Sequence, residues 1–202
     1  MEIVEIFNDI PLELTNVQSV AIDTETMGLN LSRDRLCLIQ MNFGDEKCYL
    51  LKSDDFKKAD NLKSILQNNN IQKIFHFARF DVAMLKKSLE TNINNIYCTK
   101  IASKIARTYS PKHGLKDLVR ELCGIELNKE EQSSYWGKSD ISDTQKIYAA
   151  NDVLYLHALR NKLNEILIRE DRMQLANRCF EIINLITDMD ILDFNFEYTF
   201  SH

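Results

Sequence analysis

The sequence predicts an α/β fold in which a mixed sheet is flanked by helices. Short apolar segments separated by polar breaks are concentrated in the first half of the chain, as expected for strands. Segments with helical spacing of apolar residues alternate with them and then fill the second half. Only 5 Gly and 2 Pro occur in 202 residues, so a flexible linker between domains is not expected. Together these observations favour one domain with strands first and helices accumulating later.

The strands are predicted from short buried segments. Residues 17–23 (VQSVAID), 36–43 (LCLIQMNF) and 47–51 (KCYLL) are separated by short polar breaks, which is typical of an antiparallel meander. A further strand is predicted over residues 71–77 (IQKIFHF).

The helices are predicted from apolar residues spaced three and four apart. The longest begins near Ser142, where Ser142 and Gln145 match a capping box, and its pattern continues without Gly or Pro through residue 167. The aromatic residues of the tail after residue 186 could cover the domain or an interface. Other helices are expected over residues 60–67, 80–89, 99–107, 115–122 and 172–186.

Composition narrows the class of protein. The net charge is −5, whereas a protein that binds long nucleic acid over a broad surface is usually basic. The five cysteines are scattered without a C-x-x-C pair, which argues against a zinc ribbon or a disulfide framework and favours a reducing compartment. The N-terminus lacks signal-peptide features, and no apolar run approaches the ~20 residues that span a membrane. We therefore expect a cytoplasmic protein with no membrane partner.

Three carboxylates follow predicted strands. Asp23 and Glu25 stand two apart at the end of a strand, so both side chains point to one face. Asp81 follows the strand at 71–77, which would direct it into the same crevice. Closely spaced carboxylates favour a hard cation, typically Mg²⁺ or Mn²⁺. Taken singly, these acids also fit a solvated turn and a helix N-terminus.

A fourth carboxylate lies in the long helix. Tyr148 and Asp152 are four apart and share a face, although a core tyrosine and a solvated aspartate are the simpler interpretation of each alone. Hydrolysis of a phosphodiester by two divalent ions ~3.5–4 Å apart needs several carboxylates, at least one of them bridging. We expect Asp23 to bridge, with Glu25 and Asp152 completing one ion's shell. Asp81 would hold the other ion directly or through water, and Tyr148 would orient the attacking water.

In this order, the motifs Asp23-x-Glu25, Asp81 in FHFARFD, and Tyr148-x-x-x-Asp152 resemble the tyrosine-bearing branch of the DEDD exonuclease superfamily. The histidine-bearing branch places His where this chain has Ile147. From about residue 17 to 165 the chain also resembles the ribonuclease D catalytic domain, through the segments Cys98–Ser103, His113–Leu118, Glu131–Ser134 and Trp136.

The amino-acid sequences of the motifs most resemble those of the short bacterial nano-RNase C enzymes. The resemblance implies an RNase H-like fold with about five strands, and a single 3′→5′ exonuclease domain over residues 1–202. Its core would span about 17–165, its C-terminal helix and tail 166–202, and no additional helical RNA-binding (HRDC) domains would follow. It further implies release of nucleoside 5′-monophosphates from short RNA, including dinucleotides, with DNA as a second candidate substrate. Two divalent cations, Mg²⁺ or Mn²⁺, and a homo-octamer are also implied.

A short substrate carries few phosphates, so local cations could suffice. Leu29 is where the family places an apolar wedge between bases, although a packing role is as plausible for a loop leucine. His76 is either a substrate contact or a satisfied core histidine, and Trp136 is expected in the core. Lys100, Lys104 and Arg107 form either a basic stripe toward substrate or a solvated helix face. The full set of expected substrate contacts is Thr24, Gly28, Leu29, His76, Arg79, Lys100, Lys104, Arg107 and His113, with Lys116 nearby.

Alternatives remain at this stage. One is ribonuclease D-like trimming of longer structured RNA, or digestion of DNA. A second is a catalytically inactive domain that acts as a nucleic-acid or protein adaptor. A third is a metal-dependent hydrolase of another phosphate ester.

Overall fold

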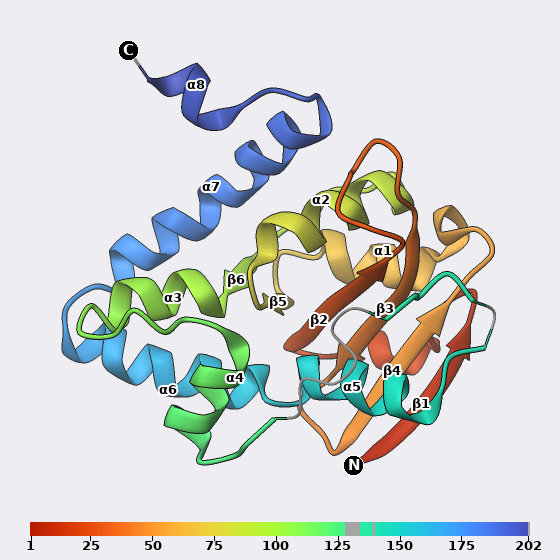
Figure 1. Cartoon of the computed structure of the whole chain (residues 1–202), viewed down its shortest axis with the longest axis horizontal. Coiled ribbons are helices and arrows are strands. Elements are labelled where there is room, and N and C mark those ends of the chain that lie inside the picture. Colours follow the sequence, from red (N-terminus) through yellow and green to blue (C-terminus); the bar gives the residue numbers. More distant parts are fainter. Residues whose placement is uncertain (128–133, 139, 202) are drawn as a thin grey trace.

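A computed structural model describes residues 1–127, 134–138 and 140–201, and within them a six-stranded mixed sheet forms the centre of the protein (Figure 1). Strand β3 is antiparallel to β2 and β4, while the pairs β1–β4, β2–β5 and β5–β6 are parallel. The predicted mixed sheet and the meander of β2, β3 and β4 are therefore confirmed. The order across the sheet is β1 (Glu2–Phe7), β4 (Lys47–Lys52), β3 (Leu36–Asn42), β2 (Ser19–Thr26), β5 (Gln72–Phe75) and β6 (Ile96–Cys98).

Two strands escaped the sequence analysis. Strand β1 lies at the edge of the sheet and none of its residues is fully buried, so it lacks the apolar run that marks a buried strand. It is defined by parallel pairing with β4, some forty residues later in the chain. Strand β6 has three residues, all buried, which is too short to show any periodicity.

The helices of the first half begin and end close to their predicted bounds. The predicted helix at 115–122 is α4 followed by a π-type turn over Val119–Cys123. The helix predicted over 172–186 is α7, which ends five residues later than predicted. None of the helices in the described part of the chain has the length and apolar character needed to cross a membrane. Their bounds are α1 (Asp60–Gln67), α2 (Ala78–Leu89), α3 (Thr99–Ala106), α4 (Leu115–Leu118), α7 (Met173–Ile191) and α8 (Phe196–Phe200).

The single long helix predicted from Ser142 is wrong, because the chain breaks at Tyr155 into α5 (Asp143–Leu154) and α6 (Leu156–Arg169). The capping box of Ser142 and Gln145 is present as predicted. Helix α5 packs across β2, β3 and β4, whereas α6 packs mainly against α3. Since one straight helix cannot bury its apolar side against both partners, tertiary packing overrides the continuous helical pattern.

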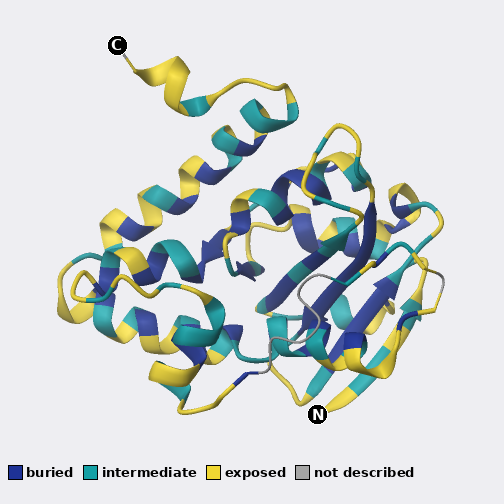
Figure 2. Ribbon diagram, in the orientation of Figure 1, coloured by how far each residue is buried: buried dark blue, intermediate teal, exposed yellow. Residues whose placement is uncertain are grey.

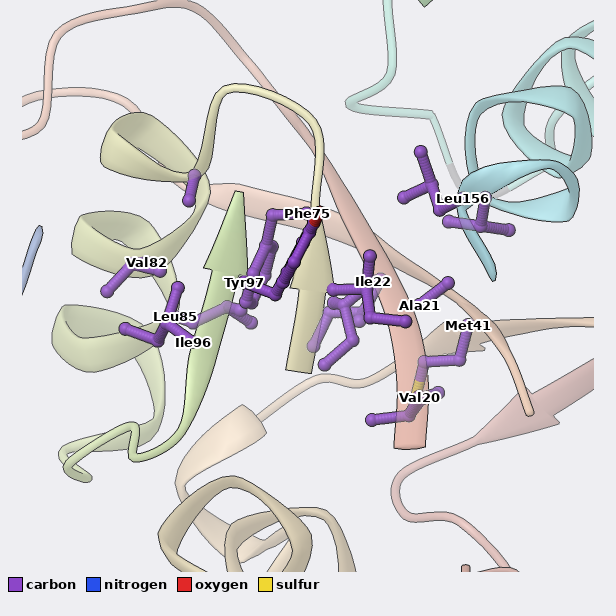
Figure 3. Close-up of a cluster of buried hydrophobic side chains, with 14 of the residues drawn as sticks. Val20, Ala21, Ile22, Met41, Phe75, Val82, Leu85, Ile96, Tyr97 and Leu156 are labelled. Atoms are coloured by element: carbon purple, nitrogen blue, oxygen red, sulfur yellow. The ribbon is translucent and has the colours of Figure 1, made fainter. Parts of the chain in front are cut away.

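Both faces of the sheet are covered. Successive side chains of a strand point to opposite faces, and Val20, Ala21 and Ile22 in β2 are all fully buried. Helix α5 packs on β2, β3 and β4, while α2 also reaches β2 together with β5 and β6. Figure 2 shows buried strands at the centre and exposure on the outer turns of the helices. Figure 3 shows part of this core: Val20, Ala21, Ile22, Met41, Phe75, Val82, Leu85, Ile96, Tyr97 and Leu156.

Helix α7 returns along the molecule and is fastened to α2. It packs against α2, α3 and β6 (Figure 1). Arg79 donates two hydrogen bonds to the Asp190 carboxylate, at 2.6 and 2.7 Å, and Lys86 pairs with Asp188. These contacts hold the C-terminal end of α7 against both the first and the last turn of α2.

Candidate active site

The centre of the site is the end of β2, the strand between β3 and β5. Asp23 and Glu25 alternate with Thr24 along this strand, so their carboxylates share one face. The register with β3 shifts between Glu25 and Thr26, which pair with Leu38 and Leu36. Such irregularities bend a strand locally and redirect its side chains.

Helix α5 brings a third carboxylate to the same place. It packs on the strands that carry Asp23 and Glu25, and its Asp152 side chain meets theirs. Oxygen atoms of Asp23, Glu25 and Asp152 all lie within 4.8 Å of one another. Residues 129 positions apart in the sequence thus form one cluster, as the sequence analysis expected.

Asp81 approaches from the first turn of α2 and is held by a neighbour of the cluster. Its side chain is buried, and Thr24 Oγ1 donates a hydrogen bond of 2.6 Å to Asp81 Oδ1. The charge of Asp81 raises the pKa of both Asp23 and Glu25. The Thr24 hydroxyl is buried and committed to Asp81, so this side chain positions Asp81, and contact of Thr24 with substrate stays a prediction.

The ionised form of the four carboxylates is electrostatically unfavourable without counterions. Burial, followed by repulsion between the acids, raises the pKa of Glu25 to about 9 and that of Asp23 well above its usual range. Burial likewise raises the pKa of Asp81 and of Asp152 to about 7. A cluster of oxygen ligands whose mutual repulsion is relieved by positive charge fits hard divalent cations such as Mg²⁺ or Mn²⁺. Within the described residues, Asp23, Glu25 and Asp152 are the acids close enough together to hold a metal ion.

Tyr148 lies one helical turn before Asp152 and lines the same cleft. Burial and the nearby carboxylates raise its pKa above the ordinary value, so the phenol stays protonated and can donate a hydrogen bond. The Trp136 ring is buried, with its centroid 6.3 Å from that of Tyr148, which confirms the expected core position of Trp136. Its neighbours Glu131, Gln132 and Ser133, which form part of the motif, lie outside the described residues.

The cluster opens into a cleft of about 430 Å³. Lys100 from α3 and Lys116 from α4 also line the cleft and supply positive charge. A cleft lined by both acids and lysines can hold cations and a phosphate diester together. The lining residues are Asp23, Glu25, His76, Phe77, Lys100, Gly114, Leu115, Lys116, Asp117, Tyr148 and Asp152.

The two predicted histidines differ in position. His76 lines the cleft, and its Nδ1 lies 2.9 Å from Thr99 Oγ1. Burial and the charge of Lys100 lower its pKa to about 3, so the ring is neutral and acts as a hydrogen-bonding group. The Nδ1 of His113 lies 2.9 Å from Ser103 Oγ, next to the cleft residue Gly114, and burial lowers the pKa of His113 as well.

The predicted role of Arg107 is wrong. Its side chain has no exposed area, because the guanidinium donates to Ser103 Oγ and the Lys112 carbonyl and pairs with Glu121. The basic stripe on α3 is therefore reduced to Lys100 and Lys104. Arg107 instead fixes the loop that follows α3 and leads to His113.

The remaining predicted contacts lie beside the cleft. Leu29 is 82% exposed in the loop between β2 and β3, which excludes a packing role. Gly28 lies against the Asp34 side chain, which would have to shift if a Cβ atom were added, because that atom would lie 2.3 Å from Asp34 Oδ2. Arg79 is engaged with Asp190 on α7, and Lys104 is exposed on α3 outside the cleft lining.

One polar residue of the site was missed. Gln40 of β3 pairs in register with Asp23, so it lies on the same face of the sheet. It is fully buried, and its Nε2 donates to Glu25 Oε1 at 3.4 Å, while its Oε1 has no hydrogen-bond partner. The signal available in the sequence was a lone glutamine inside the apolar run LCLIQMNF, whose significance depends on the strand register.

Comparison with known proteins supports this geometry. The family described as 3′-5′ exonuclease matches residues 2–168. Brucella melitensis NrnC is 42% identical, covering 100% of this chain and 99% of its own, with a TM-score of 0.94. Solved structures of that protein include one bound to pGG and one with bound Mg²⁺. These matches confirm the resemblance inferred from the motifs and the RNase H-like fold.

The curated relatives are longer. Ribonuclease D of Desulfotalea psychrophila is 32% identical over 144 residues, which is 71% of this chain and 38% of the relative. The chain spans between 31% and 44% of the length of the first four curated relatives it matches.

The raised carboxyl pKa values predict pH-dependent stability in EDTA. A carboxyl group whose pKa is higher in the folded than in the unfolded state does not lower the free energy of unfolding at low pH, where it is protonated. It lowers that free energy once it is ionised. The free energy of unfolding should therefore fall between about pH 4 and pH 9, as Asp81, Asp152 and Glu25 ionise. Asp152→Asn should recover on the order of 2–4 kcal/mol above pH 7.

Denaturant titrations across this pH range, with EDTA or with Mg²⁺, measure the effect. Divalent ions should remove most of the fall in wild type and have a smaller effect on Asp152→Asn. An unfolding free energy that is flat with pH in EDTA would contradict the electrostatic account of the cluster.

Gln40→Met should weaken the site without weakening the fold. Methionine has a similar length and removes the unpartnered Oε1, so the melting temperature should stay the same or rise. Loss of the hydrogen bond to Glu25 should lower divalent-ion affinity on the order of 10-fold, the lower end of what outer-shell ligand contacts contribute. Calorimetric titration with Mn²⁺ measures it.

Gln67→Met is the matched control for this substitution, because the amide of Gln67 bonds to Thr91 away from the cleft. Equal ion affinities in wild type and Gln40→Met would show that Gln40 does not hold Glu25.

Proposed function

We propose, because the chain belongs to the 3′-5′ exonuclease family, that it removes nucleotides from the 3′ end of RNA and prefers very short oligoribonucleotides, including dinucleotides. The observation that carries the proposal is the convergence of Asp23, Glu25 and Asp152 within 4.8 Å of one another. Nucleoside 5′-monophosphates would be the products. DNA would be hydrolysed by the same site if the 2′-hydroxyl is not required.

The chemistry follows from the side chains of the cleft. Two divalent cations would neutralise the phosphate and activate a water when bound. Asp23 would contact both ions, with Glu25 and Asp152 on one and Asp81 on the other. The protonated Tyr148 hydroxyl would hold the attacking water by a hydrogen bond. Mg²⁺ and Mn²⁺ both suit such a set of oxygen ligands.

The preference for short RNA rests on the limited positive charge. The cleft is about 430 Å³ and is lined by two lysines, on a chain whose net charge is −5. Binding of long RNA would require more phosphate contacts than this cleft supplies. The structure of Brucella melitensis NrnC bound to pGG, from a protein matched over its whole length, supports the same preference.

We also propose that the protein works in the cytoplasm. All five cysteines are free, and three of them, Cys37, Cys48 and Cys98, are buried. Free thiols of this kind are usual in reducing compartments.

A cleavage assay tests the function. RNAs labelled at the 5′ end, from a dinucleotide to a twenty-mer, are incubated with Mg²⁺, Mn²⁺ or EDTA, beside the Asp23→Ala protein as control. We expect rapid, metal-dependent loss of the dinucleotide and none with Asp23→Ala. Ladders on long RNA with an intact dinucleotide would favour ribonuclease D-like trimming. No cleavage with any metal would favour an inactive nucleic-acid-binding adaptor.

Tyr148→Phe should lower kcat on the order of 10²-fold, the scale of a positioned proton-handling group, with little change in KM. Single-turnover hydrolysis of the dinucleotide measures it. Trp136 and the core remain in place, so melting curves should match those of wild type. Unchanged kinetics would make Tyr148 a packing residue.

We further propose a homo-oligomer, with the octamer as the expected size. Helices α7 and α8 expose a run of large apolar side chains, which monomeric proteins rarely leave uncovered. Leu175, Ile182 and Leu185 recur at helical spacing on α7. The other exposed apolar residues of this C-terminal surface are Leu192, Phe194, Tyr198 and Phe200.

Sedimentation velocity tests the assembly. The double variant Ile182→Glu/Leu185→Glu should shift a large species to a much smaller one, because it places charges on the α7 surface. Leu12→Glu, at an exposed leucine near the N-terminus, is the control and should sediment as wild type. A wild-type protein that sediments as a monomer at micromolar concentration would rule the oligomer out.

A further inference from the structure

Phe77 has an unusual backbone for its side chain. It links β5 to α2, immediately before the helix, with a φ of 67° and a ψ of 50°. This left-handed region suits glycine, and a bulky aromatic residue there is a conformational outlier. Outliers of this kind cluster at functional sites, where the surrounding structure holds them in place. The ring is 51% exposed, so its burial does not explain the conformation.

The Phe77 ring stands between two cavities. On one side is the carboxylate cleft, which Phe77 helps to line. On the other is a second cavity of about 630 Å³, which it also lines. Leu29 and Phe80 add apolar surface to this second cavity. The Arg79–Asp190 pair closes one wall with its charges mutually neutralised.

The two faces of the ring have different surroundings. The Lys100 ammonium lies 4.1 Å from the ring centroid, which is the geometry of a cation–π contact. Lys100 is among the lining residues of the carboxylate cleft and not among the described lining residues of the second cavity. The ammonium therefore covers the cleft side of the ring. Among the described residues, no second cation and no aromatic ring is stacked on Phe77, so the side toward the second cavity can accept another flat group.

We propose that Phe77 is a base-stacking residue and that the second cavity binds a nucleobase of the substrate. The cavity shares Phe77 with the carboxylate cleft, so a base stacked there belongs to a nucleotide next to the phosphate at the carboxylates. Stacking on an aromatic face tolerates all four bases. Asp193 also lines the cavity, beside the paired Arg79 and Asp190, so the lining carries a net negative charge, which suits a base better than a phosphate. Lys100, held by the same ring, faces the phosphate. This inference rests on the proposed RNA hydrolysis and adds the group that positions the nucleotide.

The melting temperature of Phe77→Gly separates a role in stacking from a purely structural role of the Phe77 ring. Glycine adopts positive φ without strain, and little buried surface is lost with a half-exposed ring. Phe77→Gly should therefore melt at or above the wild-type temperature. If the ring were needed for folding, the same variant would melt lower.

The experiment compares Phe77→Gly, Phe77→Leu and Phe77→Tyr in hydrolysis of a dinucleotide and of two analogues, each lacking one base. Phe7→Leu, at an exposed ring on β1 outside both cavities, is the matched control. We expect kcat/KM on the intact dinucleotide to fall about 10-fold or more for the Gly and Leu variants, the scale of one lost stacking contact. Phe77→Tyr, which keeps the aromatic face, and Phe7→Leu should stay near wild type.

The analogues decide the interpretation. On the one that lacks the stacked base, wild type should already be slow and the Gly and Leu variants no slower. Equal losses for these variants on all three substrates, or no loss on any, would overturn the stacking role while leaving RNA hydrolysis established. A wild-type protein that hydrolyses none of the substrates would instead overturn the proposed function, and with it this inference.

Discussion

Repulsion among the carboxylates gathered at the end of β2 is the constraint on which the rest of the structure depends. Asp23, Glu25, Asp81 and Asp152 come from three elements, and loss of solvent raises the pKa of each, with repulsion from neighbouring acids adding to it for Asp23, Glu25 and Asp152. Such a cluster destabilises the fold until positive charge enters it. The surrounding core must therefore supply enough stability to keep the acids together before any cation binds. Helices α2 and α5 contribute to this stability by packing against β2, the strand that carries two of the acids.

The other elements are arranged so that their side chains reach this point. Thr24, on the alternate side of β2, holds Asp81 at the start of α2, and Gln40 of β3 reaches Glu25. The break at Tyr155 frees α5 to lie on the sheet with Tyr148 and Asp152, while α6 turns away to pack on α3. The polar contacts and the helix break thus both help to place side chains at the carboxylates.

The arginines and the lysines near the site have different roles. The arginines form contacts inside the protein. Arg107 is buried and pairs with Glu121, and Arg79 donates two hydrogen bonds to Asp190. The planar guanidinium suits such paired contacts, whereas the ammonium of a lysine acts as a compact charge. Lys100 and Lys116 are the cations that line the carboxylate cleft. An acidic protein can thus present a small amount of positive charge where a single phosphate would lie.

The sequence by itself determined the fold class, the meander and the acids that gather at the end of β2. These are local or periodic features: an apolar strand ending in Asp23-x-Glu25, a carboxylate after the next buried strand, and an i, i+4 pair on a helix. Tertiary structure alone decided the features that depend on distant partners. A solvated and a buried arginine look the same in sequence, so Arg107 could not be recognised as structural, and Gln40 matters only through its register with Asp23. The edge strand β1, the short β6 and the break at Tyr155 likewise arise because burial against other elements, rather than local preference, sets where a strand pairs and where a helix ends.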